Sequence, residues 1–143
     1  MAAAAHAAPP AWFRIAALMA ILWNAMGVYQ YLGSVGLFGD PLASLTDAQR
    51  AAAQSIPPAI VAAFAIGTFA GLIGSLGLLL RKRWAWPALL VSLLALAVLE
   101  FYVVFLSGAL AEFGGMALPV TIVAVAALLA WLANHARRRG WLD

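Results

Sequence analysis

The stretch 84–106, WAWPALLVSLLALAVLEFYVVFL, decides the fold, because its only charged residue is Glu100 in an otherwise apolar run. A transmembrane helix needs about 20 mostly apolar residues. Three further runs have this length and character, at 12–32, 59–80 and 117–136. The sequence therefore predicts an all-α integral membrane protein, in which four spanning helices form one domain over residues 1–143.

The overall composition agrees with a membrane protein and excludes several functional classes. The chain is 66% hydrophobic and 9% charged, whereas soluble domains are about 45–50% apolar and about 25% charged. There is no cysteine, and the two histidines, His6 and His135, lie near opposite ends of the sequence, so we expect no cofactor and no metal. No nucleophile–base pair or phosphate-binding loop is evident, so we do not expect an enzyme.

The basic residues predict the orientation in the membrane. Positive residues concentrate in cytoplasmic loops, and placing both termini and the 81–83 turn in the cytoplasm puts seven of the eight basic residues there. These seven membrane-surface residues are Arg14, Arg81, Lys82, Arg83, Arg137, Arg138 and Arg139. Because they flank apolar runs, lipid headgroups are the expected partner, and nucleic acid is not.

The loop at 33–58 is then periplasmic and contains a short helix. Thr46 and Gln49 match the capping-box pattern, in which the side chains at the two positions bond each other's backbone N–H groups. This pattern predicts a helix from about Asp47 to Gln54. The helix could be a lid or a simple connector on the bilayer surface.

Glycines form a stripe on the second span. Gly67, Gly71, Gly74 and Gly77 fall on one narrow helical face, and small residues allow helices to approach closely in lipid. This face could be a tight crossing within the bundle, a homodimer interface or a path for a substrate. Gly27 belongs to a similar stripe of small and polar residues on the first span.

One polar side chain on each span is predicted to lie at a similar depth, slightly outside the midplane. Helical rise places Asn24, Thr68, Glu100 and Thr121 in this layer, with Tyr31 near the same rim. Charges inside membrane spans are rare and often functional. Glu100 is expected at the contact between the first and third spans. The layer could be purely structural, could bind a solute or a proton, or could contact a partner protein.

The chain resembles a family of small bacterial four-helix membrane proteins that often carries the label "sugar transporter". The resemblance rests on Trp12-Phe13-Arg14, on Leu22-Trp23-Asn24 with Gly27, on 71–83 (GLIGSLGLLLRKR) and on Arg139-Gly140-Trp141-Leu142. It implies a sugar-like solute and a transporter.

The functional expectation is therefore a small-solute transporter or binder of the bacterial inner membrane, with its polar layer around Glu100. The alternative is a non-enzymatic accessory subunit that docks into a larger membrane complex through the glycine-rich faces. The expected partners are the lipid bilayer and a second copy of the chain or a larger complex.

Overall fold

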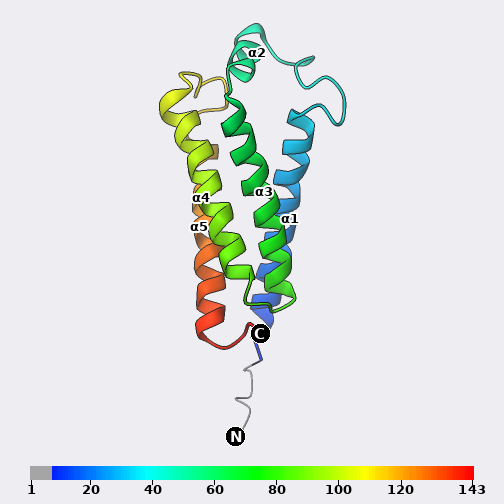
Figure 1. Cartoon of the computed structure of the whole chain (residues 1–143), viewed down its shortest axis with the longest axis vertical. Helices are drawn as coiled ribbons and strands as arrows, with labels where there is room; N and C mark the ends of the chain where they lie inside the picture. The colour runs from blue at the N-terminus through cyan, green and yellow to red at the C-terminus, as the bar shows by residue number, and fades with distance from the viewer. Residues whose placement is uncertain (1–7) are drawn as a thin grey trace, which may run out of the picture.

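The computed structural model describes residues 8–143, which are helical and contain no strand (Figure 1); His6 lies outside this range. The helices are α1 (Ala11–Ser34), α2 (Asp47–Gln54), α3 (Pro58–Leu79), α4 (Ala85–Phe101), the π-helix η1 (Tyr102–Leu106) and α5 (Ala117–Arg138). Four segments are long and apolar enough to span a membrane: α1, α3, α4 continued by η1, and α5. The fold is therefore the all-α, four-span arrangement that the sequence predicts.

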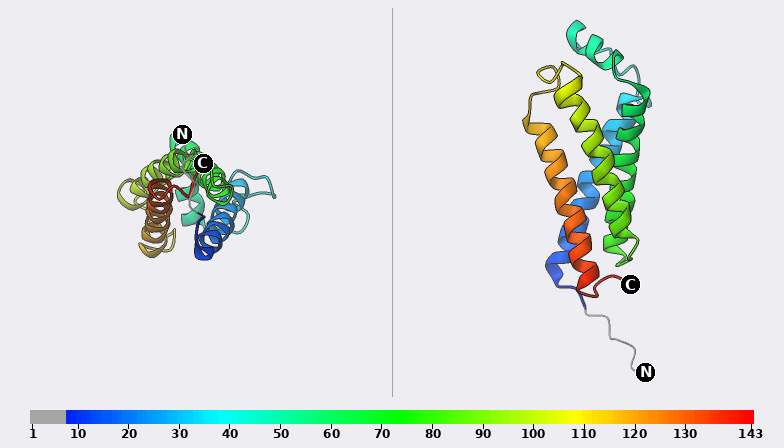
Figure 2. Two further views of the ribbon diagram at one scale, coloured as in Figure 1. Left: turned by 90° about the horizontal axis from the view of Figure 1, so that it is seen from below. Right: turned by 60° about the vertical axis from the view of Figure 1, so that its left-hand side comes forward.

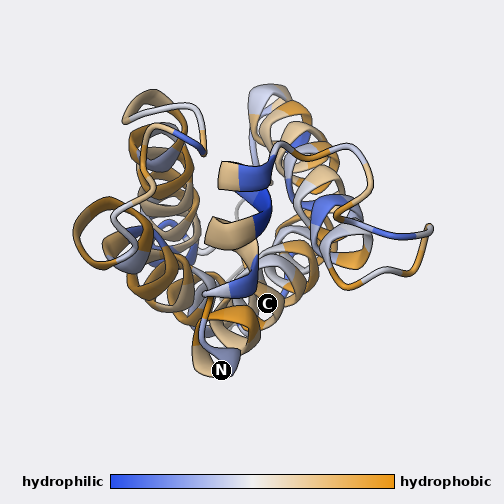
Figure 3. Cartoon of the chain, turned by 90° about the horizontal axis from the view of Figure 1, so that it is seen from above, coloured by the Kyte–Doolittle hydropathy of each residue, from blue (hydrophilic) through white to orange (hydrophobic). Residues whose placement is uncertain are grey.

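The long helices form an open curve instead of a closed bundle. α1 packs against α3, α3 against α4, and α4 against α5, so α1 and α5 face each other across the middle (Figure 2). The start of α1 and the C-terminal residue lie at one end, which we call the termini end, and α2 lies at the other (Figure 1). Seen from above, the hydrophilic surface of α2 covers the space between the two arms of the curve (Figure 3).

The side chains that face outward are those expected in lipid. Leu22 is 71% exposed and Phe105 is 69% exposed, and each long helix carries other large apolar side chains on its outer face. Exposed apolar surface on this scale does not occur on ordinary soluble monomers. The outward faces therefore suit contact with a lipid bilayer.

The core is concentrated at the end of the bundle that carries the termini. Its buried residues come from α1, α3, α4, α5 and the segment after α5: Phe13, Ala17, Ala20, Leu78, Ala85, Leu89, Leu129, Ala130, Leu132, Ala133, Ala136 and Leu142. Many of them are alanines, which permit close approach of the helix backbones. The opposite end has no comparable apolar cluster among the described residues.

Residues after α5 fold back and join this core. Leu142 is fully buried, and Asp143 exchanges backbone hydrogen bonds with the α3–α4 turn, donating to the Arg81 carbonyl and accepting from the Arg83 N–H at 2.9 Å. The Arg81 Nε also donates to the Trp141 carbonyl at 3.0 Å. These contacts tie the end of α5 to the turn between α3 and α4, and we call them the C-terminal clamp.

Helix boundaries follow local chemistry. At α2 the Gln49 N–H donates to the Thr46 hydroxyl at 3.2 Å and the Thr46 N–H donates to Gln49 Oε1 at 3.1 Å, so the capping box forms and the helix has the bounds expected from the sequence.

The third span differs from the continuous α-helix expected over 84–106. It widens into η1 directly after Phe101, where the Ser107 N–H donates to the Tyr102 carbonyl five residues earlier at 2.8 Å.

Candidate functional site

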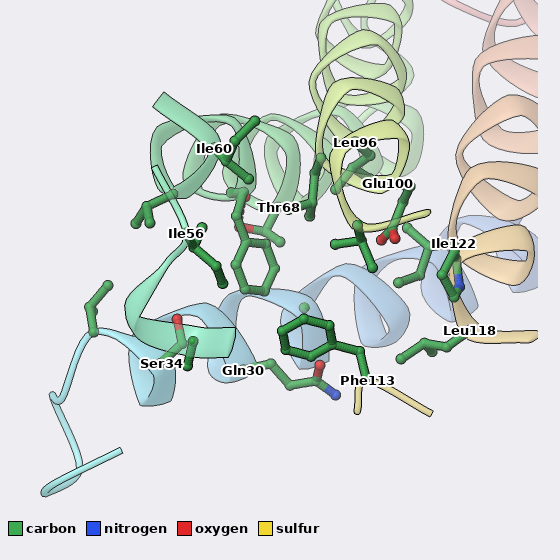
Figure 4. Close-up of a pocket in the computed structure, with 18 of the residues that line it drawn as sticks. Gln30, Ser34, Ile56, Ile60, Thr68, Leu96, Glu100, Phe113, Leu118 and Ile122 are labelled. Carbon is green, nitrogen blue, oxygen red and sulfur yellow. Dashed lines mark hydrogen bonds between the residues drawn. The ribbon is translucent and has the colours of Figure 1, made fainter. Parts of the chain in front are cut away.

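A cavity of about 650 Å³ occupies the hollow end of the bundle (Figure 4). Residues from α1, α3, α4, η1 and α5 form its walls, and residues around α2 close it from above. The walls are mostly apolar, as Ile60, Phe64, Leu96, Phe113 and Ile122 illustrate. Pockets of this size and character commonly hold small organic ligands.

Among residues 8–143, Glu100 is the only ionisable side chain that lines this cavity. It lies on the inner face of α4, is 7% exposed, and directs its carboxylate into the cavity between Leu96 and Ile122 (Figure 4). Within residues 8–143 the carboxylate has no hydrogen-bond or ion-pair partner. A buried charge without a partner is costly, so this group needs a proton or a ligand from outside the described residues.

Asn24 lines the same cavity but does not pair with Glu100. Its Nδ2 donates to the Ala20 carbonyl at 2.9 Å and to the Ser75 hydroxyl at 3.1 Å. An amide nitrogen has two hydrogens, so both are used within α1 and between α1 and α3. The sequence places Glu100 at a contact between the first and third spans. In the structure α1 packs on α3, and the cavity lies between Asn24 of α1 and Glu100 of α4.

Thr68 lines the cavity, but its hydroxyl is satisfied locally. It donates to the carbonyls of Phe64 and Ala65, at 3.0 and 3.2 Å. Its methyl group faces Gly27 of α1. Thr68 therefore contributes packing at the α1–α3 contact and no free donor to Glu100.

Thr121 and Tyr31 lie outside the cavity. Thr121 is exposed on α5 and donates to the Ala117 carbonyl at 2.8 Å, whereas its neighbour Ile122 lines the cavity. One residue rotates a helix by about 100°, which turns Thr121 outward. Tyr31 instead packs edge-on against Phe64, at a ring distance of 5.5 Å. Of the four residues expected in the polar layer, Asn24, Thr68 and Glu100 line the cavity, and no hydrogen bond joins these three side chains.

Two serines that sequence reasoning missed complete the polar contacts between helices. Ser75 accepts from Asn24 and donates to the Gly71 carbonyl at 2.7 Å. Ser92 of α4 donates to the Gly67 carbonyl of α3, also at 2.7 Å. Ser92 lies about two turns before Glu100 on the broad buried side of α4, so its polar side chain in an apolar run was the available sequence signal.

Other polar side chains line the rim of the cavity. Gln30 and Ser34 come from α1, and Gln54 comes from the end of α2. Gln30 extends toward Phe113 in the loop before α5 (Figure 4). These neutral groups can exchange hydrogen bonds with a ligand or with water.

All four glycines of the α3 stripe contact neighbouring helices or the turn within the chain. A Cβ atom would meet Leu96 at Gly67, Asn24 and Ser92 at Gly71, Leu89 at Gly74, and Trp84 and Ala85 at Gly77. Three of the four positions face α4 directly, and Gly71 faces both α1 and α4. The glycine face is therefore buried inside the bundle, where it allows α3 to approach its neighbours closely.

The seven membrane-surface basic residues gather at the termini end, because they lie at the start of α1, in the α3–α4 turn and at the end of α5. Arg81 belongs to the C-terminal clamp, and the Arg83 Nε donates to the Leu142 carbonyl at 3.4 Å. Arg137 lies over the Trp86 ring at 4.2 Å. The remaining basic residues at this end, Arg14, Lys82, Arg138 and Arg139, are exposed and available to headgroups.

Glu100 also borders a second hollow. This groove of about 570 Å³ lies between α4, η1 and α5, with walls such as Phe105, Met116 and Val123. Glu100 therefore lines both the central cavity, into which its carboxylate points, and the groove. Comparison with protein-family models, with curated proteins and with solved structures found no match.

Proposed function

We propose that this protein binds a small solute within the bilayer of a bacterial inner membrane, with both termini cytoplasmic, and that it acts as a transporter or binding protein for that solute. The observation that carries the proposal is the cavity with Glu100 as its one ionisable and unpartnered group. An ionisable residue inside a spanning segment is a functional-site hypothesis by default.

The cost of keeping Glu100 supports a functional role. The bundle satisfies Asn24, Ser75 and Ser92 through hydrogen bonds between or within helices. A residue that served only to join helices would be satisfied in the same way. Glu100 has no such bond, so its side chain is available for a proton or a solute.

The walls favour an amphipathic solute over a sugar. A sugar presents many hydroxyl groups that need partners when they leave water, since each unpaired buried polar group is costly. Besides Glu100, the polar groups that line the described cavity are few, and Asn24, Ser34 and Thr68 already donate to protein acceptors. This leaves the rim amides Gln30 and Gln54 to serve a polar solute. The larger part of the solute is therefore expected to be apolar.

The alternative, an accessory subunit that docks through its glycine faces, is less well supported. The α3 glycines pack inside the bundle, so they are not available to a partner in this arrangement. A larger complex would have to use the outer faces of the helices or the open side between α1 and α5.

A ligand-induced stability measurement tests the proposal. The probe is the neutral apolar fluorophore N-phenyl-1-naphthylamine, added to purified protein in mild detergent. At a free concentration of about 10 times its Kd, a probe that binds the folded protein stabilises it by about 1.4 kcal/mol, which raises Tm by several degrees. The variant Ile122→Trp fills the cavity and should lose this shift.

Leu128→Trp is the matched control, because Leu128 lies on the exposed face of the same helix and lines neither hollow. It should keep the shift of the wild type. Equal shifts in all three proteins would mean that the probe acts through the detergent, and the cavity would not be a binding site. If Ile122→Trp fails to fold, Leu118→Trp fills the same space from a more exposed position.

A further inference from the structure

We infer that the cavity selects hydrophobic monovalent cations, such as substituted ammonium compounds, whose positive group lies beside Glu100 and whose apolar part fills the remaining space. This inference rests on the proposed function, because it names the class of solute that the same cavity takes. Three properties of the cavity lead to it: its charge, its hydrogen-bonding state and the chemistry of its walls.

An ionised Glu100 would give the cavity a negative charge that no described lining residue neutralises. In the part of the chain that the structure describes, Glu100 is the only ionisable lining residue, and no arginine, lysine or histidine lines the cavity. No titratable group faces it from the elements around it: Phe64 and Thr68 lie on α3, Asn24 and Gln30 on α1, and Leu118 and Ile122 on α5. Arg50 of α2 is outside the lining and donates to the Leu42 carbonyl at 3.1 Å. An ionised carboxylate here attracts cations and repels anions, and low polarity strengthens both effects.

Neighbouring donors are already committed. Both Nδ2 hydrogens of Asn24 are used, the Thr68 hydroxyl bonds its own helix, and the Ser92 hydroxyl bonds the Gly67 carbonyl. None of these three side chains is therefore free to donate to the carboxylate, and the structure shows no hydrogen bond from any other described residue to it. A proton or a cationic ligand can satisfy it, and the two compete for the same oxygens.

The walls suit the apolar part of such a cation. Aromatic rings from three elements line the cavity, Trp23 of α1, Phe64 of α3 and Phe113 of the loop before α5. Aromatic faces attract cations as well as apolar groups. Branched aliphatic side chains such as Ile60 and Ile122 complete the lining, so a strongly hydrated inorganic cation would lose its water without gaining enough oxygen ligands.

Access is consistent with an amphiphile dissolved in the membrane. The cavity is lined on one side by Met26 of α1 and on the other by Leu118 of α5, and these two helices do not pack together along their lengths. The open side is apolar and would face lipid. A hydrophobic cation partitions into the bilayer and can reach Glu100 without crossing bulk water.

The test uses tetraphenylphosphonium and tetraphenylborate, which have nearly the same size and shape and opposite charge. Equilibrium binding of both ions is measured with the full-length protein in detergent, for the wild type, Glu100→Gln and Glu112→Gln. The wild type should prefer the cation. Glu100→Gln should weaken cation binding roughly 10- to 100-fold, the range expected when an interaction with a charged group is lost, and should not weaken binding of the borate.

Glu112→Gln is the matched control, because it removes the same charge from an exposed loop position outside the cavity and should bind like the wild type. Equal cation affinity in wild type and Glu100→Gln, with both folded by their unliganded Tm, would overturn the inference. If the neutral naphthylamine still binds in the cavity, the proposed function survives that result. Loss of binding by every probe would overturn both.

Discussion

Replacing Gly71 with alanine puts a methyl group into a contact between three helices that has no room for it. The added Cβ would lie 2.9 Å from both the Asn24 Cγ and the Ser92 Oγ, and closer still to the Asn24 Oδ1. The Asn24 amide cannot simply rotate away, because its Nδ2 is held by the Ala20 carbonyl and Ser75. Either α1 moves off α3 or these hydrogen bonds break.

The expected cost follows from three terms. Overpacking costs about 1–3 kcal/mol, and losing an interhelical hydrogen bond costs about 0.6–2 kcal/mol. Alanine gains back about 1 kcal/mol over glycine in helix propensity. We therefore expect Gly71→Ala to lower the free energy of unfolding by about 1–4 kcal/mol, measured by denaturation in mixed detergent–SDS micelles.

Gly27→Ala is the matched control on the facing helix. Its Cβ would lie 3.2 Å from the Thr68 Cγ2, so a shift of a few tenths of an ångström relieves the contact and the variant should be near neutral. In the background Asn24→Ala, which removes two of the three crowding atoms, Gly71→Ala should cost less than it does alone. If Gly71→Ala is as stable as Gly27→Ala, or if Asn24→Ala gives no relief, the close approach of these helices is not as described.

Three further outcomes are expected. The affinity of the wild type for tetraphenylphosphonium should rise with pH, because only an ionised carboxylate attracts the cation. Glu100→Gln should bind the cation weakly at every pH. If the wild-type affinity does not change with pH, Glu100 does not have this role. Leu142→Ala should lower the free energy of unfolding by about 2–5 kcal/mol, as deletion of a buried leucine does. Leu80→Ala truncates a side chain that is 61% exposed and should have a much smaller effect in the same denaturation assay. Single cysteines at Asp47 and Lys82 should react with an impermeant maleimide from opposite sides of the membrane, and same-side labelling would reject the proposed orientation.

The sequence was sufficient for the four spans because their length and apolar character dominate every competing signal. The expected runs at 59–80 and 117–136 correspond to Pro58–Leu79 and Ala117–Arg138 in the structure. The capping box fixed the start of α2 equally well, since both of its hydrogen bonds involve neighbouring residues. Features determined by local chemistry were therefore predictable.

The partners of the polar side chains were not predictable in the same way. Depth along a span can be counted, but the order of helices around the bundle determines which residues meet at that depth. Asn24 met Ser75 because α1 lies beside α3. Thr121 lies on the outward face of α5, and one residue along the helix separates it from Ile122, which lines the cavity. The π-helix after Glu100 left no sequence signal that we recognise.

The C-terminal clamp joins the end of α5 to the α3–α4 turn, so the helices are held together most firmly at one end of the bundle. α1 and the segment after α5 meet at the termini end, where Trp141 packs on Phe13 with ring centres 5.5 Å apart. At about 1.5 Å per residue, the 24 residues of α1 extend about 36 Å from this point. A tilt of about 5° would move its far end by about 3 Å, and α3 would have to move with it, because the two helices pack together. A small change of tilt at the packed end is thus enlarged at the cavity end, where it would change the separation of α1 and α5.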